Sequence, residues 1–152
     1  MKRLAIVLAL CAAAHAAHAD DRVTVKVGAA FQPVREAVEM AITNRGLVVN
    51  NVSHVGDMLA RTGRDTGLGK PLYGTAEVLE FCSAVVSRRM MEADPGDIVH
   101  CPYSIAVYTL PGDPATTYIG YRTHAAAGAG PALRAVDQLL QDIVSEASQS
   151  VM

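Results

Sequence analysis

The chain has 152 residues, of which 51% are hydrophobic and 18% charged, with 13 Lys and Arg against 15 Asp and Glu. This length and composition fit one globular domain with a hydrophobic core. The formal net charge of −2 offers no basic surface of the kind that attracts nucleic acid or an anionic membrane. Neither is therefore expected as a partner.

Residues 1–19 have the pattern of a secretory signal peptide. Lys2 and Arg3 form a positively charged start, residues 4–14 form an apolar run too short to span a bilayer, and Ala17-His18-Ala19 is a small-x-small cleavage site. Cleavage after Ala19 leaves 133 residues with 11 basic and 15 acidic side chains, a net charge of −4. The pattern is typical of bacterial export, so we expect a periplasmic protein without a membrane span.

The first half of the exported chain alternates strand and helix. Alternation of apolar and polar residues predicts a strand at 23–27, and residues 47–55 predict another. Between them, apolar residues at helical spacing from Val34 to Ile42 predict a helix, with Gly46 as its end. A short helix at 57–61 is expected to follow.

The glycine-rich segment 62–74, "TGRDTGLGKPLYG", predicts a surface loop. Lys70 within it invites comparison with a phosphate-binding loop. The required spacing is not met, since Pro71 follows Lys70 where that motif has Ser or Thr. We therefore interpret the segment as a solvated loop that borders a pocket.

The second half continues with a strand, a helix, a hairpin and a final helix. Asp94-Pro95-Gly96-Asp97 is a turn sequence, and a second turn at 111–114 predicts a hairpin with a longer connection. The expected elements are a strand at 76–82, a helix at 83–93, strands at 103–110 and 116–122, and a helix at 131–148.

This order predicts the α+β class with a single domain over residues 20–152. Two long helices, each with one apolar face, are expected to pack on one face of a mostly antiparallel sheet of about five strands, giving a two-layer sandwich. A parallel sheet is disfavoured because the last two strands are joined by a turn too short for a crossover.

Several segments resemble the family called domain of unknown function 302 (DUF302). They are Phe81-Cys82, "ADP" at 93–95, "HCPYSIAVYTLPGDP" at 100–114 and "TYIGYR" at 117–122. The resemblance covers most of the exported chain, from the first helix to the last. It implies a small α+β sandwich and no assigned activity, and the two cysteines mark a cysteine-containing exported subset of that family.

Besides free, inert cysteines, Cys82 and Cys101 allow three interpretations. One residue ends a strand and the other begins the next, so in an oxidising compartment they are candidates for a disulfide. They are also candidates for a redox-active thiol pair, since Cys82 precedes a helix whose dipole favours a thiolate. The third interpretation is a copper, zinc or haem site that uses them with His100, Met90, Met91 and His54 as soft and borderline ligands.

A ligand pocket is a further prediction. Glu80 shares a strand face with Cys82, and three tyrosines surround the expected hairpin. We expect the pocket near the cysteine end of the sheet, bordered by the loop at 62–74. Its candidate residues are Glu80, Tyr103, Tyr118, Tyr121 and Lys70.

The functional expectation is an exported binding or accessory module rather than an enzyme, stapled by a Cys82–Cys101 disulfide. No cofactor is required by this hypothesis. Its partner is a small ligand or another periplasmic protein, and self-association through a sheet edge stays open. The alternative is a redox protein that depends on the two cysteines, with or without a metal.

Overall fold

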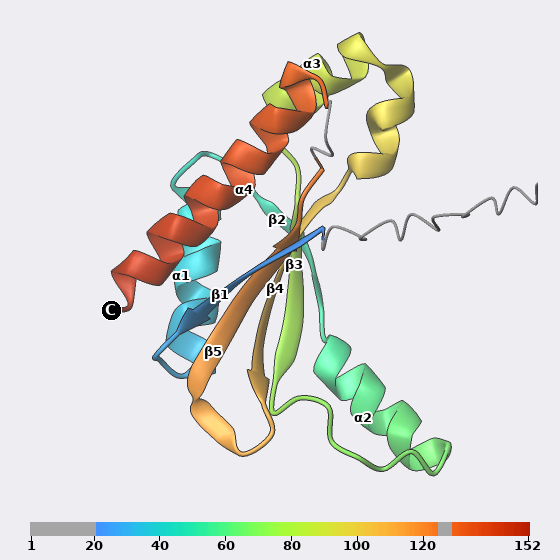
Figure 1. The fold of residues 1–152 in the computed structure, drawn as a ribbon, viewed down its shortest axis with the longest axis vertical. Coiled ribbons are helices and arrows are strands. Elements are labelled where there is room, and N and C mark those ends of the chain that lie inside the picture. The colour runs from blue at the N-terminus through green and yellow to red at the C-terminus, as the bar shows by residue number, and fades with distance from the viewer. Residues whose placement is uncertain (1–20, 125–128) are drawn as a thin grey trace, which may run out of the picture.

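The computed structural model describes residues 21–124 and 129–152, so the predicted signal peptide lies outside the described residues (Figure 1). None of the described helices is both long and apolar enough to cross a membrane. The elements are β1 (Arg22–Val27), α1 (Phe31–Thr43), β2 (Val49–Ser53), α2 (Val55–Asp65), β3 (Ala76–Phe81), α3 (Ala84–Ala93), the 3-10 helix η1 (Pro95–His100), β4 (Tyr103–Leu110), β5 (Asp113–Arg122) and α4 (Pro131–Ser150).

The five strands form one sheet in the order β1-β5-β4-β3-β2, and each neighbouring pair is antiparallel. The predicted α+β class is confirmed. The hairpin connection is shorter than expected, because β5 begins at Asp113 and only Pro111 and Gly112 separate it from β4. Gly112 has a φ of +81°, a conformation that glycine adopts without steric cost.

One face of the sheet is covered by α1 and α4, which pack against each other (Figure 1). The apolar stripes predicted for these helices enter the core, where they meet alternate residues of the strands. The buried helical residues are Val34, Val38, Ala41 and Ile42 of α1 and Val136, Leu140, Ile143, Val144 and Ala147 of α4. Burial of this stripe accounts for the two-layer architecture.

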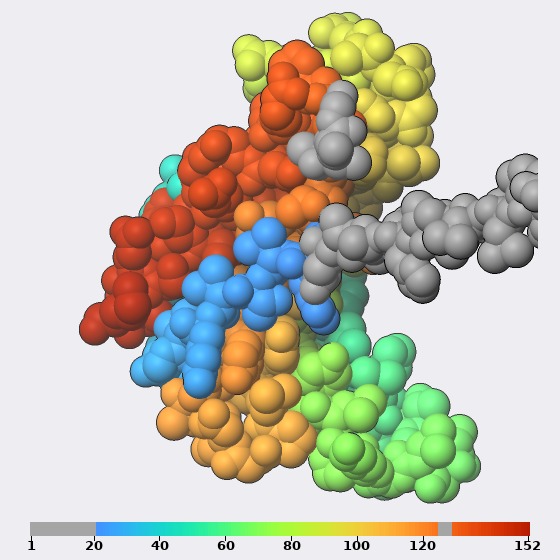
Figure 2. Space-filling view, in the orientation of Figure 1, coloured from blue at the N-terminus to red at the C-terminus, as the bar shows by residue number. Residues whose placement is uncertain are grey.

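The other helical segments project from opposite ends of the sheet. α2 with the loop after it stands at one end, and α3 with η1 stands at the other (Figure 1). Figure 2 shows these two projections as separate lobes with a recess between them. α2 has no fully buried residue, so it contributes to the rim of the recess rather than to the core.

Two further segments differ from the sequence-based expectation. α2 spans Val55–Asp65 instead of 57–61, and it ends where Gly67 takes a φ of +73°. The expected turn at 94–97 continues as η1, because the Asp94 carboxylate accepts the Gly96 N–H at 2.8 Å and Pro95 occupies the first helical turn. Both corrections lengthen the projections beside the recess.

Candidate functional site

The sheet face opposite α1 and α4 presents three rows of side chains that run across the strands. Successive residues of a strand point to opposite faces, so the registers decide which residues share this face. A central row is made of small residues: Thr24 lies opposite Gly120, Gly120 opposite Ala106, and Ala106 opposite Val78. We call these four residues the floor.

An aromatic row lies on the side of the floor that is nearer to α2. Tyr108 lies opposite Tyr118, and their rings stack with centroids 5.2 Å apart and an interplanar angle of 13°. Tyr73, from the loop after α2, meets Tyr108 edge to face at 5.5 Å. Offset-stacked and edge-to-face arrangements are the favourable ones for aromatic rings. These three residues form the tyrosine row.

A polar row lies on the other side of the floor. Arg22 lies opposite Arg122, and Ser104 lies opposite Glu80. The Arg122 guanidinium pairs with Asp21 at 3.2 Å, and Glu80 accepts a hydrogen bond from the Asn51 amide at 2.9 Å. This row therefore contains both positively and negatively charged side chains, with two arginines on its β1–β5 side.

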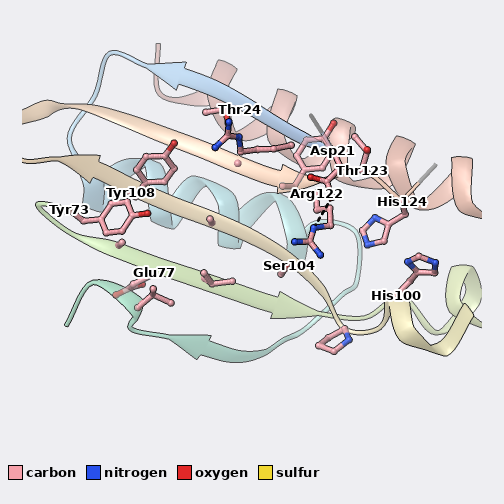
Figure 3. Close-up of a pocket in the computed structure, with 18 of the residues that line it drawn as sticks. Asp21, Thr24, Tyr73, Glu77, His100, Ser104, Tyr108, Arg122, Thr123 and His124 are labelled. Carbon is pink, nitrogen blue, oxygen red and sulfur yellow. Dashed lines mark ion pairs between the residues drawn. The ribbon is translucent and has the colours of Figure 1, made fainter. Parts of the chain in front are cut away.

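A groove with a volume of about 1270 Å³ is lined by the floor, by Tyr73 and Tyr108 of the tyrosine row, and by Arg22, Ser104 and Arg122 of the polar row. Tyr118 and Glu80 lie outside its lining. Figure 3 shows Tyr73 and Tyr108 at one end and His100 and His124 at the other, with Ser104 and Arg122 between them. The floor admits a ligand because its side chains are small. A concave surface with an apolar floor and a few convergent polar groups is the usual form of a small-molecule site.

Two histidines close the groove at the η1 end. The rings of His100 and His124 meet edge to face with centroids 5.2 Å apart. Nδ1 of His124 is buried without a hydrogen-bond partner in the part of the chain that the structure describes, although it lies 3.5 Å from Oδ1 of Asp137. That carboxylate oxygen already accepts the backbone N–H of His124 at 2.7 Å.

The environment of His124 favours its neutral form. Burial lowers the pKa of His124 most, and His100 lowers it further, against the opposing effect of Asp137. The side chain is 11% exposed, whereas that of His100 is 27% exposed. This end of the groove therefore holds a poorly solvated histidine, His124, next to a second histidine, His100.

The two cysteines lie together behind this end of the groove. Phe81 lies opposite Tyr103 in the β3–β4 pair, which brings Cys82 and Cys101 beside each other just beyond that pair. Both are free, half-buried thiols in the structure. Burial raises the pKa of Cys82 most, and the neighbouring Cys101 thiol raises it further. A raised pKa favours the thiol over the nucleophilic thiolate.

Ser87 of α3 links the cysteines to the core. Its hydroxyl lies 3.3 Å from Sγ of Cys101 and 2.9 Å from the hydroxyl of Tyr103. Burial raises the pKa of Tyr103 to about 12, so this phenol stays protonated and hydrogen-bonded. The Ser87 hydroxyl thus connects Cys101 to Tyr103, the first residue of β4.

Comparison with known proteins decides the family. Residues 23–150 match the family described as "Domain of unknown function DUF302". The chain belongs to the DUF302 family. The fold is similar to that of an uncharacterized conserved DUF302 protein from Bacillus stearothermophilus, known from a crystal structure. The TM-score is 0.66 and the sequence identity is 19%, over 88% of this chain and 100% of that chain. No curated protein matches the sequence.

The structure of this DUF302 protein does not gather the predicted metal ligands. Met90 is fully buried in the core, and Met91 packs against it. His54 precedes α2 and lies 3.1 Å from Glu77, so it stands at the opposite end of β3 from Cys82. Among the described residues, no group of three or more His, Cys, Asp or Glu side chains is placed to hold a metal ion.

The predicted pocket residues of the DUF302 domain divide between the two sheet faces. Tyr103 is fully buried in the core. Tyr121 is 8% exposed and also packs in the core, but it contributes to the groove lining, whereas Glu80 and Tyr118 lie on the open face outside that lining. Lys70 lies in a separate cavity between α2 and the loop. The loop at 62–74 borders the end of the groove away from the cysteines, because β3 runs from this loop towards Cys82.

Sequence reasoning did not assign several groove residues to the pocket: Tyr73, Tyr108, Ser104, Arg122, His100 and His124. Of these, His100 was predicted only as a possible metal ligand. The period of two along β4 was a usable signal. Tyr108 has the same parity as Ser104 and the opposite parity to Tyr103, so the two tyrosines of β4 face opposite sides. His124 carried no such signal, since it follows β5 and its position depends on α4.

Proposed function

We propose that this DUF302 protein is an exported, non-enzymatic module that binds a small ligand in the groove on the open face of its sheet. The observation that carries the proposal is the groove itself, about 1270 Å³ in volume, with a floor of small side chains between an aromatic and a polar row. α2 and η1 supply its two ends.

The composition of the floor supports binding rather than bond-making chemistry. Gly120, Ala106 and Val78 give the groove its depth and offer no acid, base or nucleophile. Glu77 lines the groove as well, but its carboxylate already pairs with Arg35 at 3.2 Å and with His54 at 3.1 Å. The floor therefore provides shape, while the histidines that could exchange a proton, His100 and His124, stand at one end of the groove.

A variant whose groove is filled by a larger side chain tests this role. A side chain at Gly120 meets only ordinary contacts, since an added Cβ lies 3.5 Å from the Val23 carbonyl oxygen. Gly120→Val should fill the groove and keep the fold, because valine suits a strand. We expect native mass spectrometry of protein isolated from the periplasm to detect a bound small molecule that Gly120→Val has lost. Identical spectra for the two proteins would refute the role of the groove.

The cysteines are proposed as a structural disulfide that forms after export. The proximity of the two thiols supports this pairing, and an oxidising compartment would favour it. The bond would close a loop of about 20 residues and stabilise the fold by roughly 3 kcal/mol in the chain-entropy model. This loop contains α3 and η1, so the bond would hold the histidine end of the groove.

A second candidate is a redox protein that uses the same two thiols. Their proximity favours it too, whereas the raised pKa of Cys82 opposes it. Replacing both residues, Cys82→Ser with Cys101→Ser, separates the candidates. A staple predicts a less stable protein that still binds its ligand once folded. A redox role predicts an unchanged fold that has lost thiol-disulfide exchange with a dithiol such as dithiothreitol.

A further inference from the structure

We propose that the ligand of the groove is an elongated aromatic anion, with its ring on the tyrosine row and its negatively charged group beside His100 and His124. This inference rests on the proposed function and adds the chemical class of the ligand. It follows from the separation of two kinds of chemistry along one groove (Figure 3).

The tyrosine row is suited to a flat ring. Tyr108 is held from one side by the stacked ring of Tyr118 and from another by the edge of Tyr73. Two ring contacts fix the orientation of Tyr108, so little conformational freedom remains to be lost when a ligand ring packs on it. Aromatic rings gain more from such contacts than aliphatic chains of the same area do.

The opposite end is suited to an anion. The Arg122 guanidinium, which pairs with Asp21 at 3.2 Å, and Arg22 line the groove beside this end. The carboxylates of Asp97 and Asp137 also approach the histidines, at 3.8 Å from His100 and 3.5 Å from His124, but neither is a lining residue. Charged and hydrogen-bonding donors therefore face the groove, while the carboxylates of Glu80, Asp97 and Asp137 stand outside its lining.

The distance between the two ends sets the shape of the ligand. Tyr108 and Ser104 are four residues apart on β4, which corresponds to about 13 Å at the usual rise of a strand, and the histidines lie beyond Ser104 (Figure 3). The floor between them has no large side chain to divide the groove. A ligand that reaches both ends must therefore be long and narrow, with the charge at one end and the ring at the other.

Binding of the anion should be coupled to protonation of His124. The groups that face this ring are His100 from η1, Asp137 from α4, Arg122 from β5 and Tyr103 from β4. In the free protein, burial keeps the pKa of His124 below its ordinary value. An anion favours the protonated ring, so affinity should increase as the pH falls, by at most tenfold per pH unit for one proton.

The test compares two probes that differ only in charge. Titration calorimetry at pH 6, 7 and 8 would use azobenzene-4-carboxylate and its neutral isostere azobenzene-4-carboxamide, with decanoate as an aliphatic anion. We expect the carboxylate to bind at least tenfold more tightly than either of the others at pH 6. We also expect its advantage over the carboxamide to shrink towards pH 8.

Variants assign the effect to the groove. His100→Gln should reduce the advantage of the carboxylate, Tyr108→Leu should weaken both azobenzenes, and Gly120→Val should abolish binding. His54→Gln is the matched control, since His54 is outside the groove lining, and it should behave as the wild type. If Gly120→Val fails to fold, Ala106→Leu replaces it as the variant with a filled groove.

The outcomes separate the inference from the function on which it rests. Equal affinity for all three probes, abolished by Gly120→Val, overturns the aromatic anion and leaves the groove as a binding site. Lack of binding by all three probes also overturns the inference, while the mass spectrometric comparison decides the proposed function independently. Binding that Gly120→Val does not change contradicts both.

Discussion

At the scale of single residues, burial decides which side chains are available for chemistry. Cys82, Cys101 and His100 were visible in the sequence as chemically capable residues, and the structure brings them to one end of the sheet. The sequence did not indicate that Ser87 would contact Cys101 or that Asp137 would stand behind His124. Each contact reaches from one element to a residue outside it, and periodicity describes only neighbours within one element.

The thiol of Cys82 should react slowly in the reduced protein. Its raised pKa lowers the thiolate fraction at a given pH, and alkylation proceeds through the thiolate. We expect iodoacetamide to modify Cys82 more slowly than it modifies an unstructured cysteine peptide at pH 8, as followed by mass spectrometry of tryptic peptides. A rate faster than that of the peptide would contradict the assigned environment and favour the redox candidate.

The stability of the fold should depend on pH through His124. Because burial lowers the pKa of His124 in the folded protein, the unfolded chain takes up this proton first as the pH falls. The folded state therefore loses stability below about pH 6.5, until the folded pKa is reached. His124→Gln should reduce the difference in free energy of unfolding between pH 7 and pH 5, as measured by urea denaturation.

The control for this measurement is His54→Gln, whose side chain is 63% exposed in the native protein. This variant should keep the pH dependence of the wild type. If His124→Gln keeps it as well, the lowered pKa of His124 is wrong.

At the scale of elements, the sequence predicted the strands and the long helices well, because each has one apolar face with a clear period. It predicted α2 poorly. α2 approaches the sheet through a glycine rather than through an apolar side chain. Gly56 lies so close to β3 that an added Cβ would be 2.9 Å from the backbone nitrogen of Ala76. A helix positioned by backbone contact leaves little trace in a hydrophobic pattern.

Gly56→Ala should therefore destabilise the junction between α2 and β3. The added methyl group meets backbone atoms, which cannot move aside as a flexible side chain does, so a loss of about 1–3 kcal/mol is expected. Chemical denaturation measures it. Gly69→Ala is the matched control, since nothing lies within 4 Å of its added Cβ. An equally stable Gly56→Ala protein would contradict the close approach.

At the scale of the whole molecule, two lobes project (Figure 2) from a sheet that has one face covered by α1 and α4 (Figure 1). Counting elements and their apolar faces was enough to predict this two-layer architecture. It was not enough to place the groove, because the relation of the loop at 62–74 to the cysteines depends on the direction in which β3 runs. The groove extends from Tyr73 in that loop to the histidines beside the cysteines, so the loop borders it at the end away from the cysteines.

Export and pairing of the cysteines can be tested together on the intact protein. We expect the mass of protein isolated from the periplasm to correspond to cleavage after Ala19, with no label on either cysteine after alkylation under denaturing conditions without reduction. Labels on both cysteines would show that two thiols stayed reduced in an oxidising compartment. That result would contradict the disulfide and leave the redox candidate in place.

The central claim is that the open face of the sheet binds a small molecule. Nuclear magnetic resonance tests it most directly, by titrating ¹⁵N-labelled protein with a periplasmic extract of molecules smaller than 1 kDa. We expect shifts of the backbone amide signals of Thr24, Ala106 and Gly120, three of the four floor residues, and we expect the shifts of Thr24 and Ala106 to be lost in Gly120→Val. Shifts confined to other surfaces, or unchanged signals on these three strands, would contradict it.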